Sequence, residues 1–496
     1  MNSPIRRVSA GCLLLVLALL VNITYIQAFW SDELNARGDN RRVTIAEYAR
    51  ERGPILLADD TPVAVSTEVD GDFQFLREYP EGRLYAPITG YYSYLYQRSA
   101  IERAQNEVLS GEDDRMFVRR LIDLVTGEEP KGGAVKLTID PAAQQAAYDG
   151  LGDNKGAVIA IDTRTGAILA MVSKPSYDPN PLASHSPSEQ REAWIDIHGD
   201  ADNDIPPDPD KPADNRAIAQ PLPPGSIFKL VTAAAALESG DYEADSVIPG
   251  PARYQLPLSE RTLPNQSGEA CGSNDQTTIT NAMRISCNTA FAYLGEELGD
   301  DVLRDQAERF GFNSQPLTNE DLRAATSRFP DDPDAPQTVL SAIGQFDVTA
   351  TPLQMAMVSA AIANDGVLMD PYVIQELRAP DLVSTIEQTE PEELSRAISN
   401  DTARQLTEMM VEVVENGTGS NAQISGIPVA GKTGTAQSAP DRPPYAWFTS
   451  FAPADEPSVA VAVVIEEAPD TARSDIGGGR LAAPIAKAVM EAVLGV

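Results

Sequence analysis

Residues 223–238 read PPGSIFKLVTAAAALE. Two prolines and a glycine cannot extend a helix backwards, so this stretch predicts a helix that begins at Ser226 and runs to about Glu238. Apolar residues occupy all of its faces, which predicts a helix buried inside a domain. Ser226 then lies at the helix N-terminus, where free N–H groups favour an oxyanion. Lys229 lies one turn further on, which places its amine within reach of the Ser226 hydroxyl.

Two further short motifs follow in the chain, Ser286-Cys287-Asn288 and Gly431-Lys432-Thr433-Gly434-Thr435. The chain has only eight lysines, and only Lys229 has a serine three positions before it. Together the three motifs supply a serine nucleophile, an amine base, a second hydroxyl with an amide, and a strand that carries a lysine. This set predicts acyl transfer that does not use histidine.

Each motif residue has an expected role and a plainer alternative. An ordinary lysine has a pKa of about 10.4, so Lys229 needs burial or a second cation, for which Lys432 is the candidate, to act as a base. Ser286 and Asn288 are expected in a loop between helices at about 278–285 and 289–298, with Ser286 passing a proton and Asn288 holding a substrate amide. Gly434 allows a substrate to approach the strand. The alternatives are helix caps for the serines and Asn288, a surface lysine, and an edge strand with glycine bulges.

Length and charge limit the classes of protein that this chain can be. Its 496 residues predict two or more folded units, and 42% hydrophobic with 22% charged residues is typical of a globular protein. The formal net charge of −35 argues against a nucleic-acid partner and against tight binding to anionic lipid headgroups.

The N-terminus carries an apolar run at about 8–30, which is long enough to cross a bilayer as a helix. Arg6 and Arg7 precede the run, and Asp32 and Glu33 follow it. The positive-inside rule then predicts a cytoplasmic N-terminus with the rest of the chain outside. The alternative is a cleaved signal peptide, although the run is long for one and no Ala-x-Ala site follows it.

Cys271 and Cys287 lie sixteen positions apart in the part predicted to be exported, where disulfides persist. We hypothesise a disulfide between them, with two free buried thiols as the alternative. Such a bridge contributes on the order of 3 kcal/mol and tethers the second motif through its middle residue.

The order of predicted strands and helices favours an α/β fold, specifically an α+β sandwich in which a mostly antiparallel sheet is covered by helices. Strands are expected at 135–139, 157–161, 167–172, 428–437, 445–451 and 458–466, and a final apolar helix at 482–494. The predicted division of the chain is a cytoplasmic tail at 1–7, a transmembrane anchor at 8–30, a β-rich pedestal without catalytic motifs at 31–130, and a catalytic domain at 131–496.

With these motifs the chain resembles a class B penicillin-binding protein, a membrane-anchored peptidoglycan D,D-transpeptidase. The resemblance covers nearly the whole chain, including the anchor, 40–42, 50–55, 156–180, Gly344-Gln345 and 478–494. It is most similar to the actinobacterial septation-linked type.

The resemblance implies a role for each motif residue. Ser226 attacks the penultimate D-alanine carbonyl and Lys229 takes its proton, while Ser286 and Lys432 pass a proton to the leaving D-alanine. The resemblance further implies that Asn288 binds an amide of the acyl chain. Thr433 and Thr435, beside Gly434, would bind the terminal carboxylate. The N–H groups of Ser226 and Thr435 would form the oxyanion hole. No metal or organic cofactor is implied, and His185 and His198 form no ligand set.

The resemblance also implies partners and a location. Stem peptides and β-lactams are the expected ligands, and division-complex proteins the expected partners. A separate glycosyltransferase is expected because no region of that size lies between the anchor and residue 130. The expected location is the plasma membrane, with a single span and an extracytoplasmic catalytic domain. The rival functions are a membrane-anchored serine β-lactamase, and a β-lactam sensor or division-complex scaffold with little turnover.

Overall fold

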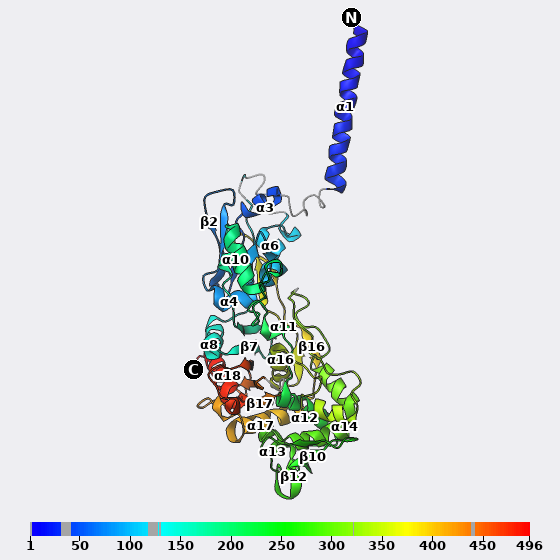
Figure 1. Ribbon diagram of the computed structural model, residues 1–496, viewed down its shortest axis with the longest axis vertical. Helices are drawn as coiled ribbons and strands as arrows, with labels where there is room; N and C mark the ends of the chain where they lie inside the picture. Colours follow the sequence, from blue (N-terminus) through cyan, green and yellow to red (C-terminus); the bar gives the residue numbers. More distant parts are fainter. Residues whose placement is uncertain (1, 31–40, 118–126, 128–129, 321, 438–441) are drawn as a thin grey trace.

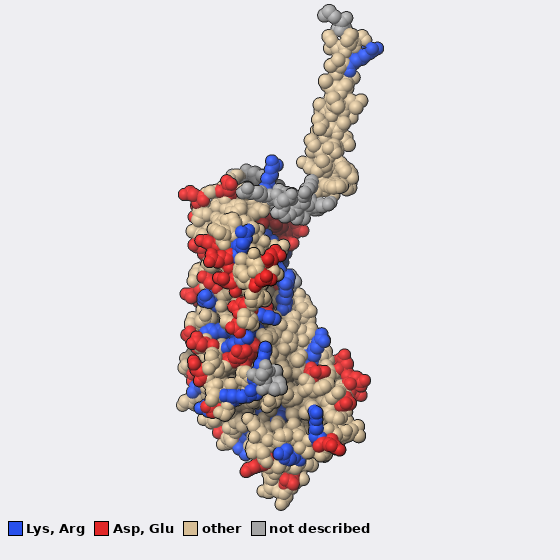
Figure 2. All heavy atoms as spheres, in the orientation of Figure 1, with Lys and Arg blue, Asp and Glu red and all other residues tan. Residues whose placement is uncertain are grey.

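A computed structural model describes residues 2–30, 41–117, 127, 130–320, 322–437 and 442–496. Its first element, α1 (Asn2–Phe29), includes a 27-residue stretch with a mean hydropathy of 2.2 that is long and apolar enough to span a membrane. The side chains of this helix are exposed, and Figure 2 shows its surface free of acidic side chains, with basic ones only towards the N-terminal end. The predicted anchor is therefore present as a single candidate span.

The catalytic half of the chain is built on a five-stranded antiparallel sheet in the order β17-β18-β19-β7-β8. Its strands are β7 (Lys155–Asp162), β8 (Ile168–Lys174), β17 (Ala430–Ala436), β18 (Tyr445–Ala452) and β19 (Val459–Glu467). The hairpin predicted for 157–172 and the three predicted C-terminal strands are thereby confirmed.

Helices cover both faces of this sheet, which explains why the residues of its strands are almost all buried. Alternate side chains of a strand enter different cores on the two faces of the sheet. Val158 packs on the face covered by α8 (Pro141–Leu151) and α18 (Ala483–Leu494). Ile159 packs on the opposite face, which is covered by α12 (Lys229–Glu238) and α16 (Pro352–Ala363). Figure 1 shows these helices around the sheet, with α18 near the C-terminus. The predicted α/β sandwich is confirmed.

Most of the other elements after residue 131 surround that core, but the helices at 180–183 and 187–198 lie beside the pedestal (α10 in Figure 1). The helices are α9 (Asn180–Ala183), α10 (Pro187–His198), α11 (Arg216–Ala219), α13 (Ile279–Arg284), α14 (Asn288–Arg309), α15 (Ala335–Ser341) and α17 (Asn400–Asn416). Three two-stranded sheets pair β9 (Val247–Pro249) with β12 (Gln276–Thr278), β10 (Arg253–Gln255) with β11 (Thr262–Pro264), and β13 (Val367–Met369) with β16 (Glu393–Arg396).

The pedestal contains a six-stranded sheet in the order β15-β14-β6-β1-β2-β3. Its strands are β1 (Ile55–Leu56), β2 (Pro62–Glu68), β3 (Phe75–Glu78), β6 (Ala134–Leu137), β14 (Ile374–Arg378) and β15 (Thr385–Gln388). The accompanying elements are α3 (Arg41–Tyr48), α4 (Gly82–Thr89), β4 (Tyr92–Ser93), β5 (Gln97–Arg98), α5 (Ala100–Ala104) and α6 (Asn106–Ser110). The predicted domain boundary between residues 130 and 131 stays a prediction. Three strands that follow this boundary in the chain, β6, β14 and β15, complete the pedestal sheet.

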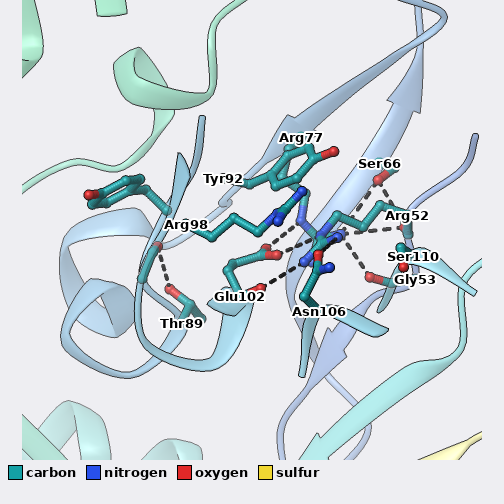
Figure 3. A network of polar contacts seen from close by, with 12 residues as sticks. Arg52, Gly53, Ser66, Arg77, Thr89, Tyr92, Arg98, Glu102, Asn106 and Ser110 are labelled. Atoms are coloured by element: carbon teal, nitrogen blue, oxygen red, sulfur yellow. Dashed lines mark hydrogen bonds and ion pairs between the residues drawn. The ribbon is translucent and has the colours of Figure 1, made fainter. Parts of the chain in front are cut away.

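A buried ion network holds the pedestal together (Figure 3). The fully buried carboxylate of Glu102 accepts hydrogen bonds from Arg52 Nε at 2.6 Å and Arg77 Nε at 2.7 Å. Burial opposes ionisation, but the two guanidinium groups outweigh it and lower the pKa of Glu102. The Arg52 guanidinium also lies 4.3 Å from the ring centre of Tyr92. Removal of one partner would leave a buried unpaired charge, so the network fixes how β1, β3 and α5 pack.

Candidate active site

Ser226 lies on a single 3₁₀ turn, Gly225–Phe228, that continues directly into α12. The predicted extent of the helix is confirmed, but its first turn is tighter than an α-helix. In a 3₁₀ turn side chains three apart eclipse each other, which puts Ser226 and Lys229 on one face. Gly225 adopts a φ of +55°, and its N–H donates to Gly344 O at 2.9 Å. A Cβ on Gly344 would lie 2.2 Å from Gly225 O, so this turn needs glycine at 344.

The Lys229 amine is fully buried and directed at the second motif. Its Nζ lies 2.8 Å from Ser286 O, 2.8 Å from Asn288 Oδ1 and 3.4 Å from Ser286 Oγ. Within the described residues, none of its hydrogen bonds goes to the Ser226 hydroxyl. The Lys229 amine is therefore held by Ser286 and Asn288, on the same face as Ser226.

Lys432 completes a line of polar groups across the site. Its Nζ, also fully buried, donates to Ser286 Oγ at 2.9 Å and to Thr433 O at 2.8 Å. Burial, and then the charge of Lys432, lower the pKa of Lys229 well below its usual value. Burial lowers the pKa of Lys432 to about 7. Ser286 thus bridges two buried amines whose pKa values are both lowered.

These two pKa values predict a bell-shaped dependence of acylation on pH. At acidic pH Lys229 gains a proton and cannot act as a base, whereas above about pH 7 Lys432 loses the proton that it donates to Ser286. We expect the second-order rate constant for acylation by penicillin to fall about tenfold per pH unit on the acidic limb. The measurement is a series from about pH 4 to pH 10 on the wild type and on Lys432→Arg, whose permanent charge should remove the alkaline decline. A flat wild-type profile would contradict the assignment.

The second motif joins α13 to α14, whose first residue is Asn288, and it is held from two directions. Ser286 has a φ of +59°, an unfavourable conformation for a serine that fixes where its hydroxyl points. Cys287 forms a disulfide with Cys271, with Cα atoms 6.0 Å apart, and its Sγ accepts from Ala290 N at 3.4 Å to cap α14. The hypothesised pairing is therefore the one in the structure.

Asn265 is a positioning residue for which the sequence offered no signal. Its Oδ1 accepts from the N–H groups of Asn288 and Thr289, both at 3.0 Å, and its Nδ2 donates to Pro251 O at 3.0 Å and Glu269 O at 2.9 Å. The side chain is 6% exposed. Asn265 thus joins the second motif to the loop that also carries Cys271.

The third motif forms β17, which is the edge strand of its sheet. A Cβ on Gly434 would lie 3.0 Å from Ile227 Cγ2 and 3.1 Å from Pro224 O. The glycine is thus needed for close packing against the Ser226 turn, and the expectation that a substrate approaches the strand here stays a prediction. Trp447 reinforces this contact, because its Nε1 donates to Pro223 O at 3.0 Å.

The predicted site residues therefore lie together. Ser226, Lys229, Ser286, Asn288 and Lys432 come from three separate segments and meet beside one strand, whose next residues are Thr433, Gly434 and Thr435. Thr433 is buried and Thr435 half-buried. Thr418, a residue outside the three motifs, contacts Thr433, with 2.6 Å between the two Oγ1 atoms.

Family comparisons agree with this geometry. Residues 156–491 match the model of the penicillin-binding protein transpeptidase domain, and residues 52–135 match that of the penicillin-binding protein A dimerisation domain. The chain belongs to the penicillin-binding protein transpeptidase family.

Among its relatives is peptidoglycan D,D-transpeptidase PbpA of Mycolicibacterium smegmatis, 44% identical over 502 residues that cover 100% of this chain and 99% of the relative. PbpA of Mycobacterium tuberculosis is also 44% identical, with the same coverage. The solved ceftriaxone acyl-enzyme complex of penicillin-binding protein A from M. tuberculosis superposes with a TM-score of 0.85 at 43% identity, covering 91% of this chain and 100% of the other. A penicillin G acyl-enzyme complex of the same protein gives a TM-score of 0.83 at 42% identity, covering 90% and 100%.

Proposed function

We propose that this chain is a peptidoglycan D,D-transpeptidase that cross-links stem peptides through an acyl-enzyme on Ser226. The observation that carries the proposal is the buried line Lys229–Ser286–Lys432 beside Ser226, in a chain whose family has solved β-lactam acyl-enzymes. A neutral buried amine is a base that can accept the hydroxyl proton at physiological pH.

The proposed reaction has two halves. Ser226 Oγ bonds to the carbonyl carbon of the penultimate D-alanine as its proton passes to Lys229 Nζ. The C–N bond then breaks, and the leaving amine of D-alanine takes a proton through Ser286, which Lys432 supports. In the second half an amine of another stem peptide attacks the carbonyl carbon of the ester, and its proton passes to the same base. The ester bond to Ser226 Oγ then breaks, and Ser226 regains its hydroxyl proton.

Binding roles are assigned by similarity to the penicillin-binding protein family. Asn288 is assigned to the acyl-chain amide, and Thr433 and Thr435 to the terminal carboxylate, beside the charge of Lys432. The backbone N–H groups of Ser226 and Thr435 are assigned to the oxyanion hole. This assignment is supported by the edge position of β17, because alternate backbone groups of an edge strand are not paired within the sheet.

The location and partners complete the proposal. The single candidate span and Arg6 and Arg7 before it favour a plasma-membrane anchor with the catalytic domain outside. We assign the activity to septal wall synthesis with divisome proteins and a separate glycosyltransferase, by similarity to the septation-linked type.

The test uses the detergent-solubilised full chain and a synthetic stem pentapeptide with an amine acceptor. We expect release of D-alanine and a cross-linked dimer, and, after incubation with penicillin, a penicilloyl adduct on the peptide that contains Ser226. An adduct on another serine would contradict the assigned nucleophile. Rapid loss of the adduct would favour a β-lactamase, and a stable adduct without any peptide product would favour a scaffold.

A further inference from the structure

A pair of threonine hydroxyls lies at the edge of the third motif. The Oγ1 atoms of Thr418 and Thr433 are 2.6 Å apart, and either can donate. Thr433 is 7% exposed, whereas Thr418 is exposed to solvent. Within the described part of the chain no other hydrogen bond reaches either oxygen. The pair has two protons and uses one internally, so one O–H remains for an acceptor outside the pair.

The backbone holds Thr418 rigidly between the second and third motifs. Its N–H donates to Arg284 O at 3.4 Å, two residues before Ser286. A Cβ on Gly479 would lie 2.1 Å from Thr418 O and 3.3 Å from Thr433 Cγ2, and one on Gly417 would lie 2.4 Å from Arg284 O. Gly417 lets the turn that carries Thr418 pack against the end of α13. Gly479 lets its own segment pack against the other side of this turn.

We propose that Thr418 helps to recognise the free carboxylate at the end of the acyl donor. The Thr418–Thr433 pair presents its remaining proton to a carboxylate oxygen, and the same strand carries Lys432, whose Nζ donates to the backbone O of Thr433 at 2.8 Å. Thr418 is therefore a specificity and positioning residue, selective for donors with a negative terminus. The inference rests on the proposed function, because it takes the D-alanyl carboxylate or its β-lactam counterpart as the ligand.

The experiment measures acylation of the full chain by benzylpenicillin and by its methyl ester, using intact-mass spectrometry. The variants are Thr418→Val, which keeps the shape but loses the hydroxyl, and Thr418→Ser, which keeps the hydroxyl. Ser420→Ala is the matched control, since Ser420 is an exposed hydroxyl two residues further along the same turn.

For Thr418→Val we expect the second-order rate constant with the free acid to fall about tenfold, the size of one hydrogen bond to a charged group. With the ester it should stay within about twofold of wild type, because the charged acceptor is missing. Thr418→Ser and Ser420→Ala should match wild type with both compounds.

Three outcomes would overturn the inference. An unchanged rate for Thr418→Val with the free acid would exclude the role. An equal loss with acid and ester would show that Thr418 only supports the strand. If Ser226→Ala were labelled as fully as wild type, the proposed function itself would fail, and the carboxylate site would fall with it. The three results differ from one another, so the failing claim can be identified.

Discussion

Replacement of Lys229 by methionine should reduce the rate constant for acylation of Ser226 by penicillin by about a thousandfold, within the range for loss of a general base. The amine is the buried group that shares a face with the nucleophile, and burial and the charge of Lys432 lower its pKa, which favours the neutral form that can accept a proton. Methionine fills a similar volume without a proton acceptor. The measurement is time-resolved labelling with a fluorescent penicillin.

Two controls separate this loss from unfolding. Lys174→Met removes a half-buried lysine away from the site, whose Nζ donates to Gly152 O, and should acylate like wild type. The Lys229→Met protein itself should melt no lower than wild type. Because the folded-state pKa of Lys229 is lowered, the unfolded chain binds the extra proton, so this lysine destabilises the fold below about pH 10.5, increasingly as the pH falls towards its folded pKa. Near-normal acylation of a folded Lys229→Met protein would refute the role of Lys229 as the base.

The sequence predicted the parts of this molecule that depend on local spacing. Ser226 and Lys229 are three positions apart, so their shared face follows from any helical turn. The alternation in β18 and β19 predicted strands that pair in chain order. The match of three motifs in order was informative because each contains residues with specific chemistry.

Contacts between distant segments could not be predicted in this way. Asn265 is 23 residues from Asn288, and Thr418 is 15 from Thr433, and both are common residue types whose roles exist only in the folded chain. The pairing of β6 with β14 joins Leu137 to Ile374, and no local pattern announces it. The packing of the Ser226 turn against Gly434 was not predicted for the same reason, because the two segments are far apart in the chain.

The disulfide between Cys271 and Cys287 gives the second large effect that we expect. Replacement of both cysteines by serine should lower the free energy of unfolding by about 3 kcal/mol, because the unfolded chain is no longer constrained by a closed loop. In the wild type, Cys287 Sγ caps α14 by accepting a hydrogen bond from Ala290 N. A serine at 287 can still cap this helix, so the measured difference does not come from loss of the cap. Denaturant unfolding of wild type and of the double variant, with and without reductant, measures the difference.

The same variant should also acylate more slowly, by about tenfold, because Ser286 depends on this tether. Ser286 has an unfavourable φ of +59°. Without the adjacent bridge, the side-chain links from 251–271 to the motif among the described residues are the Asn265 hydrogen bonds and the bond from Asn288 Nδ2 to Pro264 O. Reduction of wild type with dithiothreitol should reproduce the loss, whereas reductant should leave the serine variant unchanged. If the variant lost stability but acylated at the wild-type rate, the bridge would support the fold without setting the position of Ser286. The pair of measurements therefore separates a stabilising crosslink from one that also orders the proton path between Lys229 and Lys432.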